Sequence, residues 1–195
     1  MKRLLAILLL PFLLTGCLTS TNSFFADGDI IQDDRLIGTY PNEQEEAKFV
    51  IQQDHDHEGR YDVRIYDKHA WIAYVGTVFK IGRVTFLDLY PSGDAGMRRD
   101  PGGPPTTTEL LHTFTFQPLH LVMRISPADT ELTYATIDRR GLGELITREP
   151  TLRPYIRGES LLLPLPTAAL KKLLQKYGAS DEIFNTKATL KKGKE

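Results

Sequence analysis

Short runs of apolar residues, or of alternating apolar and polar residues, follow one another along most of this 195-residue chain and are separated by turn-forming residues. Side chains on a strand point alternately to its two faces, so a period of two predicts a strand with one buried face. Runs that follow each other across a few turn residues are typical of antiparallel neighbours. The pattern predicts a mainly β domain, an antiparallel meander curled into a sheet or partial barrel.

The predicted elements divide the chain as follows. The strands of the meander are expected at 37–40, 47–53, 60–66, 70–81, 83–90, 110–117, 120–126 and 131–137. A long loop is expected over 91–108, because Gly and Pro are frequent there. A short helix over 138–148, a strand over 160–165, a C-terminal helix over 167–177 and an edge strand over 186–191 complete the prediction.

The N-terminal segment has the layout of an export signal. Lys2 and Arg3 precede an apolar core over residues 4–14, which Pro11 interrupts. A helix needs roughly 20 apolar residues to span a bilayer, so this core is too short for a permanent span. We therefore expect residues 1–16 to be a signal peptide that is removed.

The end of this segment, Leu14-Thr15-Gly16-Cys17, resembles the lipobox of bacterial lipoproteins. The resemblance implies cleavage between Gly16 and Cys17, attachment of diacylglycerol to the Cys17 thiol and acylation of the new amino terminus. Each buried methylene of such an anchor contributes about 0.8 kcal/mol, so attachment is effectively permanent. The resemblance also implies a cell-envelope location. With Leu18 rather than aspartate after the cysteine, this is the outer membrane facing the periplasm in a Gram-negative source. In a Gram-positive source it is the outer face of the plasma membrane.

One domain is expected in the mature chain. Removal of residues 1–16 from the 195 leaves 179, a length that suits one domain. We expect a lipidated cysteine and flexible tether over 17–35, because this stretch is polar and acidic with little periodicity. A single β-rich domain follows over 36–192, with a short tail at 193–195.

Charge and cysteine content exclude several functional classes. The chain has 24 Lys plus Arg and 25 Asp plus Glu; without Lys2 and Arg3 the balance is 22 to 25, a net charge of −3. This balance gives no indication of a nucleic-acid partner. Cys17 is the only cysteine, which excludes an intramolecular disulfide, a zinc-thiolate cluster and a cysteine nucleophile elsewhere in the chain. No cofactor is expected.

The densest cluster of metal-capable side chains is the run of residues 54–58, Asp-His-Asp-His-Glu. In an extended strand, His55 and His57 would project to the same side and could share a Zn, Cu or Ni ion with a carboxylate. The alternative is a charged hairpin tip that holds no ligand. His55 and His57 are the metal-ligand candidates of the sequence.

Two further histidines lie in neighbouring predicted strands. His112 shares its alternation with Phe114 and Phe116, and His120 follows eight residues later, so the four could form a pocket wall; the alternative is half-buried histidines bonded to backbone carbonyls. No catalytic residue is assigned: there is no Gly-x-Ser-x-Gly motif, and Ser92 has no base that the sequence identifies.

The start of the predicted domain, residues 36–40, resembles the Gly-x-Trp start of lipocalins, with Tyr40 in place of the tryptophan. The order of the predicted elements, a β meander after the lipobox and then a C-terminal helix, is similar to that of small uncharacterised envelope lipoproteins with a lipocalin-like β domain. The resemblance implies a fold and an anchor rather than an activity.

These features together predict a membrane-anchored envelope lipoprotein. Its β domain is expected to be a non-enzymatic binding or interaction module whose partner is an envelope component. One alternative is a lipocalin-like carrier that holds a small apolar ligand against Val78, Leu87, Phe114 or Phe116. The other alternative is a hydrolase, because the residues of a catalytic triad are brought together only by the fold.

Overall fold

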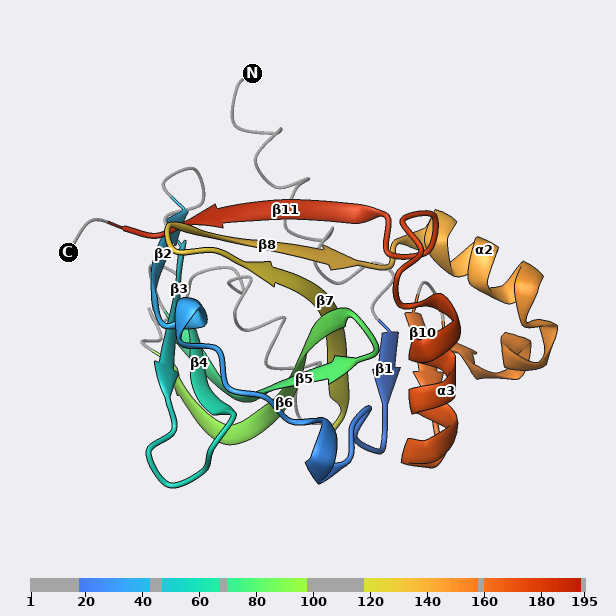
Figure 1. Ribbon diagram of the computed structural model, residues 1–195, viewed down its shortest axis with the longest axis horizontal. Helices are drawn as coiled ribbons and strands as arrows, with labels where there is room; N and C mark the ends of the chain where they lie inside the picture. The colour runs from blue at the N-terminus through green and yellow to red at the C-terminus, as the bar shows by residue number, and fades with distance from the viewer. Residues whose placement is uncertain (1–17, 43–46, 67–69, 98–117, 158–159, 194–195) are drawn as a thin grey trace, which may run out of the picture.

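The computed structural model describes residues 18–42, 47–66, 70–97, 118–157 and 160–193 (Figure 1). Eleven strands among these residues form one mixed sheet, which is not closed. The predicted fold class, a mainly β chain with an antiparallel meander and a C-terminal helix, is confirmed.

The meander forms a strongly curled sheet, seen on the left of Figure 1. Each of its strands pairs with the next in antiparallel fashion, and β11 pairs with β8 at the end of the row. Its strands are β2 (Gly38–Asn42), β3 (Ala47–Gln53), β4 (Arg60–Tyr66), β5 (Ala70–Ile81), β6 (Val84–Met97), β7 (His120–Pro127), β8 (Glu131–Thr136) and β11 (Thr186–Lys191). The end of β11 approaches β2, where the Gly193 N–H donates to the Thr39 carbonyl at 2.8 Å.

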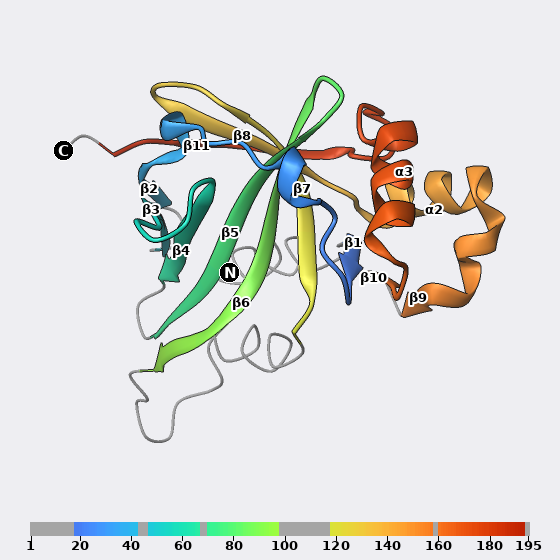
Figure 2. The ribbon, with the colours of Figure 1, turned by 60° about the horizontal axis from the view of Figure 1, so that its bottom comes forward.

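The hairpin of β5 and β6 separates two hydrophobic cores. These are the longest strands of the described chain and run through the middle of the molecule (Figure 2). Val78 and Leu87 belong to the core on the inner side of the curl, whereas the neighbouring Phe79 and Phe86 belong to a second core beneath the helices. Both faces of this hairpin are therefore buried, which explains its nearly continuous apolar sequence.

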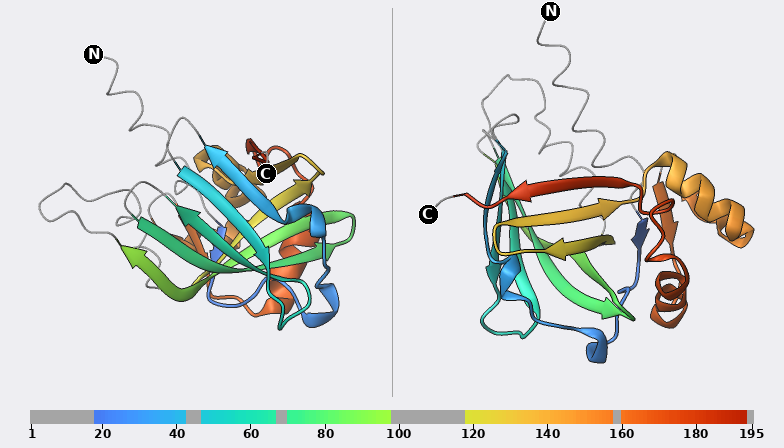
Figure 3. Two further views of the ribbon diagram at one scale, coloured as in Figure 1. Left: turned by 90° about the vertical axis from the view of Figure 1, so that its left-hand side faces the viewer. Right: turned by 45° about the horizontal axis from the view of Figure 1, so that its top comes forward.

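The helices cover the second core at one end of the molecule, as the right-hand view of Figure 3 shows. Helix α2 (Arg139–Arg148) begins at Asp138, whose carboxylate accepts hydrogen bonds from the N–H groups of Arg140 and Gly141. A 3-10 helix, η5 (Pro150–Tyr155), follows it. Helix α3 (Thr167–Tyr177) buries Leu170 and Leu174. Within the described ranges, no helix is long and apolar enough to cross a membrane.

Residues 18–36 differ from the flexible tether that we predicted for 17–35. Strand β1 (Leu18–Ser20) lies between β7 and β10 (Ser160–Leu163), antiparallel to the first and parallel to the second, and β9 (Ile156–Arg157) pairs with β10. Leu18 is 2% exposed and Ser20 is fully buried. Leu18, the first residue that the structure describes, is therefore already part of the sheet.

The rest of this stretch also packs against the sheet. Phe24 and Leu36 are fully buried, and Ile30 forms a β-bridge with Phe79. Two 3-10 helices, η3 (Asp27–Asp29) and η4 (Asp34–Leu36), lie on either side of this bridge. The apolar residues of this stretch occur as adjacent pairs without a helix or strand period, so periodicity did not predict that the segment is packed. The pairs are Phe24-Phe25, Ile30-Ile31 and Leu36-Ile37.

The sheet also extends into part of the predicted loop over 91–108. Strand β6 continues to Met97, which lies opposite Ala70 of β5, and the register shifts between Ile72 and Tyr74. Pairing with the long strand β5 thus keeps Pro91–Met97 extended, although this segment contains turn-forming residues. The strand predicted at 110–117 lies outside the described residues.

Candidate functional site

The strongest candidate site is a buried carboxylate–imidazole pair in the centre of the sheet. Asp88 of β6 lies opposite Val122 of β7, so His120 is its diagonal neighbour on the same face. The His120 Nδ1 atom lies 2.6 Å from the Asp88 Oδ2 atom. The Asp88 side chain is 2% exposed and that of His120 is 17% exposed, so the histidine lies between the carboxylate and the surface.

Burial dominates the electrostatics of the pair. It raises the pKa of Asp88 above its ordinary value, and the hydrogen bond and charge of His120 oppose this shift. The second carboxylate oxygen, Oδ1, is buried and has no hydrogen-bond partner among the described residues. His120 is therefore the group that compensates the cost of burying this carboxylate.

Two further side chains adjoin the pair. The Tyr90 ring lies 4.7 Å from the His120 ring, centroid to centroid. Ser20 of β1 lies directly opposite His120 in the strand register, but its hydroxyl donates to the Leu163 carbonyl at 2.7 Å and accepts from the Asn22 N–H at 3.1 Å. The Ser20 hydroxyl is thus bonded to the backbone rather than to the imidazole.

The pair has the geometry of a histidine oriented by a carboxylate. A hydrogen bond from Nδ1–H to Asp88 leaves Nε2 of a neutral His120 as a proton acceptor. Such an imidazole can exchange a proton with a bound group or act as a general base. Ser92, the serine considered in the sequence, is elsewhere: its hydroxyl donates to the Ala73 carbonyl at 3.2 Å.

The sequence identified one half of this pair. His120 was expected to share a pocket wall with His112, Phe114 and Phe116, and these three residues lie outside the described ranges. The partner of His120 in the structure is Asp88, which the sequence did not predict as a site residue. A signal was present, because Asp88 is a charged residue inside the otherwise apolar run 86–89, Phe-Leu-Asp-Leu.

The two candidate metal-ligating histidines lie on the turn between β3 and β4 rather than on an extended strand. The Asp54 N–H donates to the Arg60 carbonyl at 3.0 Å and closes the turn, so the alternation assumed for His55 and His57 does not apply. Both histidines are exposed, and His57 Nδ1 lies 3.0 Å from a carboxylate oxygen of Asp54. Among the described residues, no group of three or more His, Cys, Asp or Glu side chains could hold a metal ion.

The predicted lipidation site cannot be placed, because Gly16 and Cys17 lie outside the described residues. The residues assigned to the wall of an apolar carrier site can be placed in part. Val78 and Leu87 lie opposite each other on β5 and β6 and are buried in the inner core at 0% and 3% exposure. Each packs there among other apolar side chains.

Comparisons with protein-family models, with curated proteins and with solved structures found no match to this chain.

Proposed function

We propose that this protein is a membrane-anchored lipoprotein of the cell envelope and that its β domain is a non-enzymatic binding or interaction module. The anchor would be the lipidated Cys17, and the location would be the periplasmic face of the outer membrane in a Gram-negative cell. The supporting observation is that β1 begins at Leu18, one residue after Cys17, and lies between two other strands. The predicted cleavage point thus lies one residue before a strand that is paired on both sides.

This arrangement would hold the domain close to the bilayer. A strand rises by about 3.3 Å per residue, so Ser20 would be roughly 10 Å along the strand from the lipidated cysteine. Since β1 is paired on both sides, it leaves no free segment between the anchor and the sheet. The module would therefore meet partners within or next to the membrane surface rather than search a large volume on a linker.

The first experiment concerns the anchor. Mass spectrometry of the chain purified from membranes should find an acylated N-terminus at Cys17, and Cys17→Ala should abolish this processing. A mature chain that starts elsewhere, or an unmodified Cys17, would contradict the proposed anchor.

A second experiment distinguishes the binding module from a carrier. Crosslinking in intact cells, followed by mass spectrometry, should link the domain reproducibly to an envelope component. Native mass spectrometry of the same protein tests the alternative, because a co-purified small apolar molecule would identify a lipocalin-like carrier.

A hydrolase is a second candidate function, and the observation that favours it is the pair of Asp88 and His120. Labelling of the folded protein by a serine-reactive phosphonate, lost in His120→Gln, would support this candidate. An unlabelled protein would argue against a serine nucleophile activated by this histidine.

A further inference from the structure

A cleft lined by basic side chains lies apart from the pair of Asp88 and His120, on the surface of β7 and β8. Its volume is about 460 Å³. It brings together residues from four places in the chain: η4, the turn between β5 and β6, strands β7 and β8, and the segment from α3 into β11. The lining residues with charged side chains are Arg35, Arg83, Arg124 and Lys187.

None of the lining residues is acidic. Two of the cations share one carboxylate: Arg124 lies 2.5 Å and Lys187 lies 3.0 Å from the oxygens of Asp181, whose side chain is 67% exposed. Arg83 is exposed and forms no ion pair with the residues that the structure describes. Positive charge therefore exceeds the negative charge paired with it on this side of the cleft.

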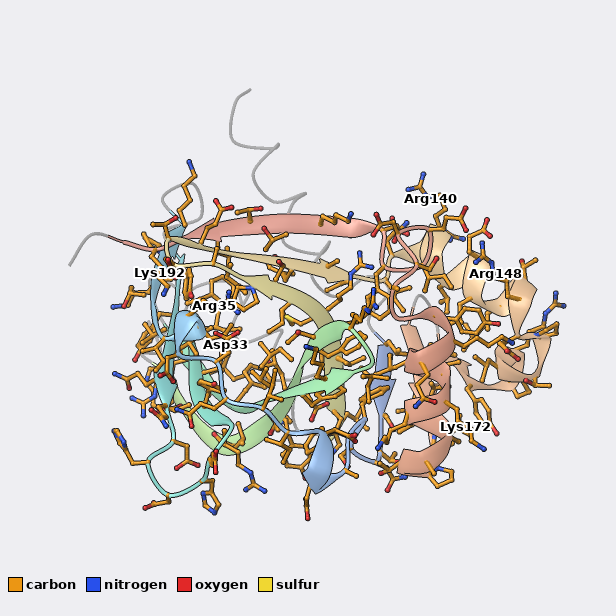
Figure 4. All side chains as sticks on the ribbon, in the orientation of Figure 1. Asp33, Arg35, Arg140, Arg148, Lys172 and Lys192 are labelled. Atoms are coloured by element: carbon orange, nitrogen blue, oxygen red, sulfur yellow. The ribbon has the colours of Figure 1, made fainter. Side chains whose placement is uncertain are left out.

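On the other side of the cleft, the single cation Arg35 lies beside carboxylates. Arg35 extends from η4 beside Asp33, with which it makes two hydrogen bonds of 2.7 and 2.8 Å (Figure 4). Asp129, on the turn between β7 and β8, is a further carboxylate near Arg35. Arg35 is thus held in a fixed position by Asp33.

Arg124 is the most rigidly placed cation of the cleft. Its guanidinium donates to Asp181 and to the backbone carbonyls of Gly178 and Phe184, and it lies 5.6 Å from the centroid of the Phe184 ring. Its side chain is 15% exposed. A guanidinium held in this way is prepared to bind an anion without losing much further side-chain freedom.

We propose that this cleft binds a small molecule that carries phosphate. Guanidinium groups match the oxygens of phosphate in pairs, and the hydroxyl groups of Thr85, Ser126 and Thr133 line the same surface. The volume lies within the range of small-molecule sites, roughly 300–1,000 Å³, and exceeds what a single phosphate group fills. The proposal goes beyond the envelope module and does not depend on the lipid anchor.

The test is isothermal titration of the full chain in nonionic detergent. One probe is inorganic pyrophosphate, which represents free phosphate compounds. The other is dihexanoyl phosphatidylglycerol, a monomeric lipid whose headgroup carries a phosphodiester. Saturable binding of either probe is expected, and the probe that binds more tightly identifies the source of the phosphate. Absence of binding for both probes at concentrations up to about 10 mM would overturn the proposal.

Variants localise the binding. Arg83→Gln changes an exposed turn residue without an ion pair to the described residues, so it leaves the fold intact, and it should weaken binding roughly tenfold, the value of one charge-assisted hydrogen bond. Lys187→Gln is a second variant at an exposed cleft residue, although it also removes the ion pair with Asp181. The matched control is Arg153→Gln, an exposed arginine on η5 outside the cleft. Equal loss in Arg153→Gln, or no loss in both cleft variants, would show that general charge attracts the probes and would overturn the proposed site.

Discussion

Substitution of His120 by leucine is expected to destabilise the fold strongly. It removes the hydrogen-bond partner that the described residues provide for the Asp88 carboxylate, whose side chain is 2% exposed and whose Oδ1 atom is already unpaired. Loss of one partner from a buried pair of this kind costs about 3–5 kcal/mol in the free energy of unfolding. Asp88→Asn retains an oxygen that accepts from His120, so we expect a smaller loss of about 1–2 kcal/mol.

The dependence on pH separates the electrostatic cause from simple loss of packing. Burial raises the pKa of Asp88, and His120 opposes the rise; without His120, the pKa in the folded state is higher still. A carboxyl group with a higher pKa in the folded state than in the unfolded state binds more protons when folded. Its folded state therefore loses stability as the pH rises from about 4 through the folded-state pKa.

Two variants that both lack His120 isolate this effect. His120→Leu keeps the Asp88 carboxyl, whereas the double variant Asp88→Asn/His120→Leu has no group to ionise. The double variant should be more stable than His120→Leu at pH 7.5, and the difference should shrink on acidification toward pH 4.

The assay is urea unfolding followed by the fluorescence of Trp71, the single tryptophan, on β5. His57→Leu is the control, because His57 lies in an exposed turn and does not pair with a buried carboxylate. A difference between the two His120 variants that does not change with pH would refute the reasoning. The reasoning would also be refuted if the His120→Leu protein were at least as stable as the Asp88→Asn protein.

Two further predictions concern helix α2 and the turn histidines. Gly141→Ala should destabilise the protein by about 1–3 kcal/mol in thermal or urea unfolding, because the new Cβ would lie 2.1 Å from the Ile183 carbonyl oxygen. Gly143→Ala, where a Cβ would meet nothing within 4 Å, should stabilise the same helix by about 0.5–1 kcal/mol; stabilisation by both would contradict the close packing. Titration of zinc into the full chain should give no saturable signal that depends on His55 and His57, because they lie on an exposed turn and the described residues form no three-ligand group. A tight site lost in His55→Ala/His57→Ala would refute this expectation.

Much of the meander could be predicted from local sequence. The observed bounds of β3, β4 and β5 coincide with the predicted ones, and α3 occupies the predicted residues 167–177. In each case the apolar period and the flanking turn residues lie within the element itself. Such signals act between residues that are close in the chain, so they can be recognised without knowledge of the fold.

Strand β1 could not be predicted from local sequence signals. It has three residues and its place in the sheet depends on the edges of β7 and β10, which are about 100 and 140 residues away in the chain. A strand of this length has no period to detect. It is buried because β7 and β10 flank it. The segment next to the proposed anchor is therefore a paired strand instead of the predicted tether.

The order of the strands, the C-terminal helix and the lipobox-like motif on which the proposed anchor rests could be recognised in the sequence, because each depends on residue types at short spacing. Which polar groups come together depends on the three-dimensional fold. Asp88 and His120 are 32 residues apart, and the cations of the cleft come from four separate segments. Their meeting depends on strand register and on the curl of the sheet, which bring distant residues within hydrogen-bond distance and which no local pattern specifies.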